Sequence, residues 1–251
     1  MASSYDAIPD FGLLYDSVPL YAARQDVGFY LEEAKAARGT VLEVGCGTGR
    51  ILLPIARAGI PITGIDGSKQ MLERCRAKLR GERATLVQHD MRDFDLGAQF
   101  DLIIAPFRVM QHLTTIDDQL RFLATVSRHL APQGRGRLIF DVFNPSFDRL
   151  VSADGVEHED TPEQRLPDGR TFRRTYRIVR VRWMDQVSEA ELVYYVDGTR
   201  YVQAFEMRWY LAAELRNLLA RAGFRVREIY GDFARGPLVD GCPELVVVAE
   251  Q

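Results

Sequence analysis

One short stretch limits what this chain can fold into more than any other. In residues 41–56, VLEVGCGTGRILLPIA, the glycines Gly45, Gly47 and Gly49 separate two apolar segments that both need burial. Glycines in a turn from a strand into a helix let the backbone approach a ligand and expose the N–H groups of the helix start. In a doubly wound sheet this turn lies at the ligand crevice. We therefore expect a ligand-binding turn here; the alternative is a tight turn without a ligand.

The alternation of strand and helix continues to about residue 144. Short apolar runs predict strands, and apolar residues at helical spacing predict the helices between them. We expect strands at 41–44, 60–65, 84–88, 100–105 and 138–143, and helices at 11–21, 22–37, 50–58, 68–79 and 115–130. Ser68 is a predicted helix N-cap, and Pro132 with Gly134 ends the last of these helices.

After Pro145 the pattern changes. Residues 152–209 alternate Thr, Arg, Tyr and Val between turn signals, which is typical of an antiparallel meander. One helix and two strands then follow, at 211–222, 224–230 and 244–249. The expected fold is α/β, a doubly wound, mostly parallel seven-stranded sheet with helices on both faces plus an inserted antiparallel β meander. The expected domains are a core at 1–151 and 210–251 and an insertion at 152–209.

Composition excludes several classes of protein. A net charge of −3 gives no bulk attraction to nucleic acid. The chain has no apolar run long enough for a membrane span, and its start has no signal-peptide pattern. The three cysteines have no metal-ligand spacing and are expected to be free thiols in a reducing compartment. We therefore expect a cytoplasmic protein without a metal site.

The spacing of the glycines decides between two cofactor classes. A nicotinamide-binding turn has the pattern G-x-G-x-x-G, whose third glycine would fall on Arg50. The motif instead runs Glu43-x-Gly45-x-Gly47-x-Gly49 and resembles the first motif of class I S-adenosylmethionine-dependent methyltransferases. The resemblance implies that the loop, Cys46 included, backs the methionine part of the cofactor. It also places Glu43 beside that end.

Three further motifs carry the same resemblance. Asp66 follows the second strand in GIDGSKQML (64–72), where the family's acid binds both ribose hydroxyls, and Gly67 belongs to this expected site. The resemblance implies that Met71 packs near the adenine. It implies that Asp90 accepts a hydrogen bond from the adenine amino group, with the Met91 N–H on a ring nitrogen. The alternative for Asp66 is a simple turn acid.

The loop FDLIIAPFRVMQHL (100–113) resembles the family segment that faces the sulfonium and the substrate, which places Pro106 at the cofactor. His112 is a candidate general base, or a histidine hydrogen-bonded locally. Arg108 is expected to orient a substrate carboxylate or phosphate, or to pair with an acid such as Asp141. Asn144 contacts substrate or satisfies the turn before Pro145.

The N-terminal segment and the insertion supply the remaining candidates. The resemblance implies an N-terminal helix that closes over the cofactor and offers it a tyrosine hydroxyl. Tyr15 and Tyr21 fit that role, and amphipathic packing is their alternative. Tyr194 and Tyr201 lie on the expected apolar face of the insertion. That face would cover the crevice as a lid, or pair two copies in a homodimer.

The insertion has a provisional register. A two-residue turn at Asp185-Gln186 would place Arg182 opposite Glu189 and Arg180 opposite Glu191, on a solvated face. The other face would then carry the apolar set Val179, Val181, Trp183, Ala190, Leu192, Tyr194, Tyr201, Gln203, Phe205 and Met207. Such charge pairing argues against reading the arginines of 170–182 as a nucleic-acid surface.

The combined prediction is a methyltransferase that moves a methyl group from S-adenosylmethionine to N or O of a small molecule by in-line displacement. The alternatives are a non-catalytic S-adenosylmethionine-binding module and, less favoured, a nicotinamide-dependent dehydrogenase. A nucleic-acid methyltransferase is disfavoured because residues 105–108 read APFR and lack the Asn/Asp-Pro-Pro-aromatic loop. We expect a small-molecule substrate and neither nucleic acid nor membrane as a partner.

Overall fold

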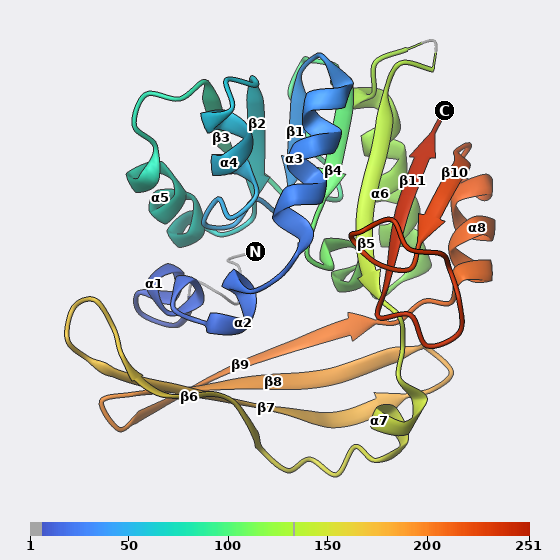
Figure 1. The fold of residues 1–251 in the computed structure, drawn as a ribbon. Coiled ribbons are helices and arrows are strands. Elements are labelled where there is room, and N and C mark those ends of the chain that lie inside the picture. The colour runs from blue at the N-terminus through green and yellow to red at the C-terminus, as the bar shows by residue number, and fades with distance from the viewer. Residues whose placement is uncertain (1–6, 133) are drawn as a thin grey trace.

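The computed structural model describes residues 7–132 and 134–251. Its larger sheet has seven strands in the order β10-β11-β5-β4-β1-β2-β3 (Figure 1). They are β1 (Val41–Val44), β2 (Ile62–Asp66), β3 (Ala84–Gln88), β4 (Leu102–Ala105), β5 (Arg137–Phe143), β10 (Arg225–Tyr230) and β11 (Glu244–Glu250). Strand β11 pairs antiparallel with β5 and β10, and all other neighbours are parallel. The predicted doubly wound, mostly parallel sheet is confirmed.

Helices cover both faces of this sheet. The helices of the chain are α1 (Phe11–Asp16), α2 (Pro19–Ala22), α3 (Asp26–Ala37), α4 (Leu52–Arg57), α5 (Lys69–Lys78), α6 (Ile116–His129), α7 (Phe147–Val151) and α8 (Ala212–Arg221). One buried cluster joins the sheet to α6 and α8, and a second joins it to α3, α4 and α5. Among the described residues, no helix combines the length and apolarity that crossing a membrane requires.

Helix α6 shows how local sequence sets these elements. The side chain of Thr115 caps the helix by accepting from the Asp118 N–H at 3.1 Å. Asp117 and Asp118 place negative charge in the first turn, where the helix dipole favours it. Phe122 and Val126 are among the buried residues that pack the helix onto the sheet. Ser68 caps α5 in the same way, as predicted, by accepting from the Met71 N–H.

The inserted meander is a second sheet of four antiparallel strands, in the order β6-β7-β8-β9. Its strands are β6 (His158–Arg165), β7 (Thr171–Arg182), β8 (Val187–Val196) and β9 (Thr199–Arg208). Figure 1 shows this sheet lying across the end of the core toward which β5 runs, with α1 and α2 between the two layers. The short helix α7, which the sequence pattern did not predict, carries the chain from β5 into the meander.

The predicted register of the β7–β8 hairpin is wrong. Arg182 pairs with Val187, not Glu189, and Arg180 pairs with Glu189, not Glu191. The strands are joined by residues 183–186, so the loop has four residues where a two-residue turn was expected. Asp-Gln lacks the conformational freedom that two-residue hairpin turns require.

A β-bulge between Ile178 and Arg180 also shifts β7 by one residue. Val179 is 48% exposed and Trp183 44% exposed, so the expectation that they lie on the covered face is wrong. On β8 the inner residues Ala190, Leu192 and Tyr194 line the cavity described below, as expected. The outer face is charge-paired as predicted. Arg182 contacts Glu189 at 2.6 Å, as expected, although the two residues are not directly opposite in the register, and Glu191 is paired at 2.6 Å with Arg177 instead of Arg180.

The N-terminal segment forms three helices where two were expected. Pro19 occupies the first turn of α2, where a residue without an N–H is tolerated, and so begins a new helix. The Arg38 residue that ends α3 has a positive φ of 54°. Because α1 ends at Asp16 and a new helix begins at Pro19, the first two helices form a short, bent segment over the end of the core (Figure 1).

Candidate active site

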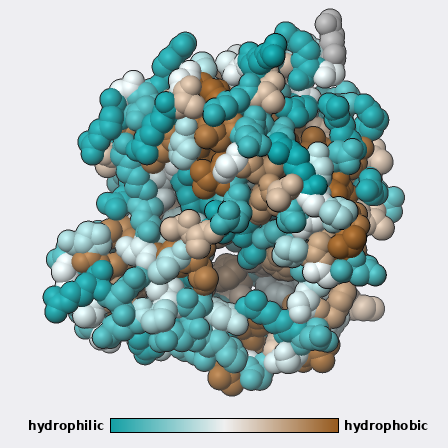
Figure 2. Space-filling model, viewed as in Figure 1, coloured by the Kyte–Doolittle hydropathy of each residue, from teal (hydrophilic) through white to brown (hydrophobic). Residues whose placement is uncertain are grey.

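A cavity of about 1380 Å³ lies between the carboxyl ends of the parallel strands and the inner face of the second sheet. Helices α1 and α2 line a third side, and Figure 2 shows a hollow between the upper and lower parts of the molecule. Ligands of open α/β sheets bind at this edge. Sites for one small molecule usually have roughly 300–1,000 Å³, so the cavity has room for two ligands.

The glycine turn forms part of the cavity wall. Gly45 has a φ of +70°, and a Cβ atom there would lie 2.5 Å from Val109 Cγ2, so the turn tolerates no side chain at this position. Gly45, Cys46 and Gly47 line the cavity, but Gly49 is not among its lining residues. A Cβ atom at Gly49 would meet Cys75 Sγ at 2.6 Å, so this glycine serves the packing of α4 against α5.

Asp66 closes the glycine turn from the neighbouring strand. Its carboxylate accepts hydrogen bonds from the N–H groups of Gly47 and Ser68, both at 2.8 Å. Asp66, Gly67 and Met71 all line the cavity. The acid therefore ties the ends of β1 and β2 together and presents its carboxylate at the cavity wall.

Glu43 is the buried acid of the site. It lies on β1, lines the cavity and is 2% exposed, and its Oε2 atom is buried without a hydrogen-bond partner. Burial raises the pKa of Glu43 well above its usual value, and the charge of Arg50 only partly opposes this. An unpartnered carboxylate oxygen at a cavity wall favours a ligand that brings a positive charge.

Asp90 and Met91 follow β3, and Pro106 follows β4; all three line the cavity. Asp90 is held by Arg92, whose Nη2 lies 2.5 Å from Asp90 Oδ2. The hydrogen bonds from Arg92 lower the pKa of Asp90, so its carboxylate is ionised at neutral pH. Motif reading did not single out Arg92.

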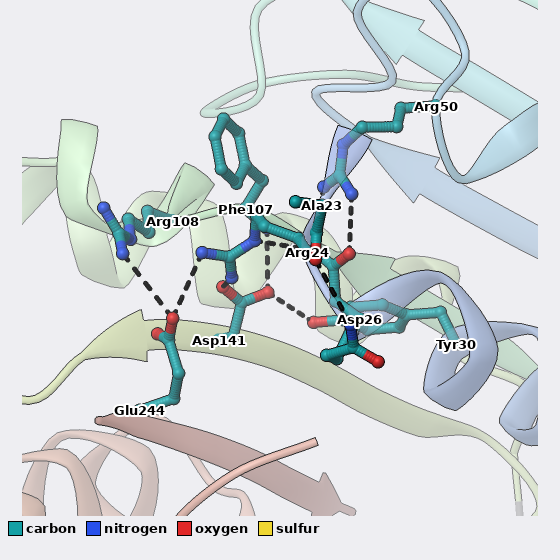
Figure 3. Close-up of polar contacts among 10 residues, drawn as sticks. Ala23, Arg24, Asp26, Tyr30, Arg50, Phe107, Arg108, Asp141 and Glu244 are labelled. Atoms are coloured by element: carbon teal, nitrogen blue, oxygen red, sulfur yellow. Dashed lines mark hydrogen bonds and ion pairs between the residues drawn. The ribbon is translucent and has the colours of Figure 1, made fainter. Parts of the chain in front are cut away.

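A buried ionic network joins the N-terminal segment to the core (Figure 3). Asp26 accepts from Arg50 Nη1 and Nη2 at 2.6 and 2.8 Å and from Arg24 Nε at 3.0 Å. The Arg24 guanidinium continues to Asp141 Oδ2 at 3.3 Å and to Glu244 Oε1 at 3.1 Å. These residues come from the N-terminal segment, the glycine turn, β5 and β11, so the network clamps the segment onto the site.

Phe107 lies where this network meets the cavity. Its backbone N–H donates to Asp141 Oδ1 at 2.8 Å, and its φ is +59°, a region that L-residues rarely adopt. The guanidinium carbons of Arg24 and Arg50 lie 4.8 and 4.9 Å from the centre of its ring. Arg108 follows with a φ of +69°. Two successive residues in this conformation mark a strained turn at the site.

Comparison with known proteins agrees with this geometry. A family model described as a methyltransferase domain matches residues 41–134. The chain is 31% identical over 161 residues to the dTDP-3-amino-3,4,6-trideoxy-alpha-D-glucopyranose N,N-dimethyltransferase of Streptomyces venezuelae, which covers 64% of each protein. The CcbJ methyltransferase from Streptomyces caelestis has a TM-score of 0.77 at 22% identity, over 99% of this chain and 97% of that one. S-adenosylmethionine-bound CalS10, an amino pentose methyltransferase from Micromonospora echinaspora, has a TM-score of 0.69 at 26% identity, over 94% and 95%.

The chain belongs to the class I S-adenosylmethionine-dependent methyltransferases. The predicted family, enzyme class and cofactor are thereby confirmed, and the nicotinamide-dependent alternative is set aside. The cavity fits the cofactor, because the unpartnered oxygen of Glu43 suits a positively charged ligand and the side-chain-free turn at Gly45 allows close approach. Within the described ranges, no group of three or more His, Cys, Asp or Glu side chains is arranged to hold a metal ion.

The methyltransferase places its three polar candidates at the cavity wall. His112 ends the short 3₁₀ helix η2 (Val109–His112), and its ring centre lies 6.3 Å from that of Phe205 on β9. Burial lowers the pKa of His112, and contact with the backbone of Glu206 opposes this. The imidazole is therefore neutral at pH 7 and able to accept a proton.

Arg108 and Asn144 both line the cavity and both have partners in the protein. Arg108 Nη2 lies 3.5 Å from Glu244 Oε1, so it pairs with an acid, but that acid is Glu244 and not Asp141, the example that the sequence suggested. Asp141 is taken by Arg24, Tyr30 and the Phe107 N–H. Asn144 Nδ2 donates to the Cys242 carbonyl at 2.8 Å, which fixes the end of β5 against the loop before β11.

Of the four tyrosine candidates, three line the cavity and one does not. Tyr15 and Tyr21 lie with ring centres 4.6 Å apart, and the Tyr21 hydroxyl accepts from Arg174 Nη1 at 2.6 Å. Tyr194 lines the cavity from β8. Tyr201 pairs with Tyr194 across β8 and β9 but does not line the cavity. It packs instead against the apolar cluster beneath α1.

Proposed function

We propose that this methyltransferase methylates an amino nitrogen of a small, sugar-like substrate held beneath the second sheet. The observation that carries the proposal is the neutral His112 imidazole on the cavity wall between η2 and β9. Such a base matches an ammonium group, whose pKa is about 8 for an α-amine, and is far too weak for an alcohol. The S. venezuelae relative and CalS10, named for amino sugar substrates, support the same choice.

The proposed cofactor site is built from the glycine turn and the ends of β1, β2 and β3. Glu43 and the turn Gly45–Gly47 would face the methionine part, and Asp66 the ribose. Met71, Asp90 and Met91 would surround the adenine, with Tyr15, Tyr21 and Pro106 at the side of the N-terminal segment. When bound, S-adenosylmethionine supplies a methyl group on a positively charged sulfur and leaves as a thioether.

The chain's own residues would then position the acceptor and remove its proton. The acceptor nitrogen must approach the methyl carbon in line with the carbon–sulfur bond, at roughly 3 Å in the near-attack geometry. His112 would take the proton that this nitrogen loses, so that its electron pair forms the new bond while the sulfur keeps the pair of the old one. Arg108, Asn144 and Tyr194 would orient the substrate.

The second sheet would act as a lid. Residues of β7, β8 and β9 line the cavity, which supports an inserted unit at 152–209 that covers a core of 1–151 and 210–251. Excluding water strengthens the electrostatic interactions inside a site. The competing role, a homodimer surface, was expected on this same apolar face, and residues of that face line the cavity. All three cysteines are buried free thiols, which favours a reducing, cytoplasmic location.

A Glu43→Gln variant tests the cofactor site. We expect S-adenosylmethionine to bind about 10- to 100-fold more weakly, because the cationic ligand favours the ionised form of Glu43 and an amide cannot supply that negative charge. Isothermal titration calorimetry with S-adenosylmethionine measures this directly. Unchanged affinity would remove Glu43 from the proposed site.

The same Glu43→Gln variant, although expected to bind the cofactor more weakly, is expected to gain stability relative to the wild type as the pH rises. Because the pKa of Glu43 is raised by folding, the wild-type protein is stabilised below the unfolded pKa of about 4.3 and loses that stability as pH rises through the folded pKa. The variant does not titrate, so its unfolding free energy should rise relative to the wild-type value as the pH increases from about 5 to 8. Urea denaturation at pH 5 and pH 8 should show the gap growing with pH.

The function itself is tested with paired acceptors. Purified enzyme, S-adenosylmethionine and dTDP-3-amino-3,4,6-trideoxyglucose should give products with one or two added methyl groups by mass spectrometry. The analogue with a hydroxyl in place of the amine should remain unmodified. Preferential methylation of the hydroxyl analogue would overturn the choice of nitrogen, and cofactor binding without turnover on a wide amine panel would favour the non-catalytic alternative.

A further inference from the structure

Among the described residues, one arginine of the cavity wall differs from the others because it has no nearby carboxylate partner. Five of the arginines in its wall have a carboxylate within 4.0 Å: Arg24, Arg50, Arg92, Arg108 and Arg174. Arg149 of α7 also lines the cavity, but among the described residues no carboxylate lies within that distance of its guanidinium. Its side chain instead lies over the Tyr176 ring, with the guanidinium carbon 4.7 Å from the ring centre. The cavity wall thus carries an exposed positive charge that has no acidic partner among the described residues and is stacked on the Tyr176 ring.

A second guanidinium near the end of β5 is only partly neutralised. Arg108 lies 3.5 Å from Glu244 Oε1, the same oxygen that Arg24 contacts at the shorter distance of 3.1 Å. Arg108 Nε is buried without a hydrogen-bond partner, and its guanidinium lies 5.2 Å from the centre of the Phe143 ring. Phe143 is the last residue of β5, four residues before α7 begins. Two cationic groups, Arg108 from the loop after β4 and Arg149 from α7, therefore lie over aromatic rings at the cavity wall.

The two ends of the cavity differ in charge. Glu43, on β1, has an unpartnered carboxylate oxygen, whereas Arg108, in the loop after β4, and Arg149, on α7, lie in another part of the cavity wall. In a partly enclosed cavity such fixed charges select ligands of opposite sign. A cationic cofactor suits the first end, so the ligand at the second end should be an anion.

We propose that Arg149, together with Arg108, binds the diphosphate of a nucleotide-linked acceptor; this deepens the proposed function and rests on it. A guanidinium offers planar, bidentate donors that match phosphate oxygens. Two such groups suit a ligand with two linked phosphates better than a single carboxylate. Stacking on Tyr176 restricts the Arg149 side chain before the ligand binds, which reduces the conformational entropy lost on binding.

The test is a binding measurement that needs no turnover. Calorimetric titration of the full chain with dTDP, in the presence of S-adenosylhomocysteine, should give affinity that falls about 10- to 100-fold in Arg149→Gln. Arg149→Lys, which keeps the charge without the planar fork, should show a smaller loss. Inorganic pyrophosphate should compete with dTDP in the wild type, and rising salt should weaken both.

The matched control is Arg173→Gln. Arg173 of β7 lies over the ring of Tyr195 on β8, with a carbon-to-ring distance of 3.7 Å; this is the same kind of stack in the same sheet, but neither residue lines the cavity. Its dTDP affinity should equal that of the wild type. Wild-type affinity in Arg149→Gln, or failure of the wild type to bind either dTDP or pyrophosphate, would overturn the proposal. If dTDP binding depends on Arg149 while amines are not methylated, the anion site stands and the proposed function falls.

Discussion

An Asp26→Asn variant is expected to lose on the order of 3–5 kcal/mol of unfolding free energy, because it leaves buried arginine charges without their partner. Asp26 is fully buried and receives three hydrogen bonds from Arg50 and Arg24. An asparagine can accept on one oxygen only and carries no charge. Urea denaturation at pH 7 measures the difference.

The pH dependence of this loss gives a second readout. Burial alone would raise the pKa of Asp26, but hydrogen bonds and charge from Arg50 and Arg24 lower it below its usual value. A lowered pKa contributes stability above the unfolded value of about 3.9, and that stability is lost as pH falls through the folded pKa. The gap between wild type and variant should therefore be constant from pH 5 to 8 and shrink below about pH 4.

Asp10→Asn is the matched control. Asp10 pairs with Arg170 at 3.0 Å, but its side chain is 61% exposed, so solvent screens the pair. We expect a change below about 1 kcal/mol. A loss of similar size in both variants, or a loss below about 1 kcal/mol for Asp26→Asn, would show that the network of Figure 3 does not hold the N-terminal segment in place.

The network also explains the presence of Arg50, which served in the sequence analysis only as evidence against a nicotinamide-binding turn. Arg50 argued against a nicotinamide-binding turn because it replaces a glycine. In the structure the same residue reaches Asp26 from the glycine turn and packs its guanidinium against Phe107. The arginine side chain therefore has a structural role here, because it links the glycine turn to the N-terminal segment.

What could be predicted from sequence follows from short-range physics. The parallel core is visible because strands and helices have different apolar periods, and the glycine turn because its backbone excludes side chains. By contrast, Arg24 lies 117 positions from Asp141 and 220 from Glu244, so no local pattern connects them. The bulge at Val179 did have a local signal that was missed: Ile178 and Val179 are two apolar residues in succession, so the alternation breaks at the place where the pairing with β8 has its extra residue.

The candidate site divides in the same way. The residues proposed for the cofactor belong mostly to contiguous motifs and line one cavity, apart from Gly49. The residues proposed for the substrate come from separate elements, so motif reading overlooked Arg149 and placed Tyr201 at the wall. A signal for Arg149 was nonetheless present: it is a cation just after the fifth strand, where the chain must pass the crevice.

A His112→Gln variant is expected to lower kcat on amine acceptors by about 10²- to 10⁴-fold, the usual contribution of a positioned general base. Glutamine keeps a polar side chain of similar reach but cannot take up a proton at neutral pH. Because burial lowers the pKa of His112, the wild-type kcat should fall only at pH values below about 6.5, where the imidazole becomes protonated. Steady-state kinetics from pH 5 to 9 should show this acidic limb in the wild type and its absence in the variant.

Two measurements separate loss of a base from loss of structure. S-adenosylmethionine affinity should stay within about threefold of the wild type, since His112 lies at the lid and not at the β1 or β2 ends, and a change of that size is below 1 kcal/mol. Acceptors whose amines are already deprotonated at the assay pH should regain part of the lost rate, because the missing base is then no longer needed. If kcat is unchanged, or if it falls together with cofactor affinity and without any change in the pH profile, His112 supports the fold of the loop after β4, and the acceptor must lose its proton to solvent.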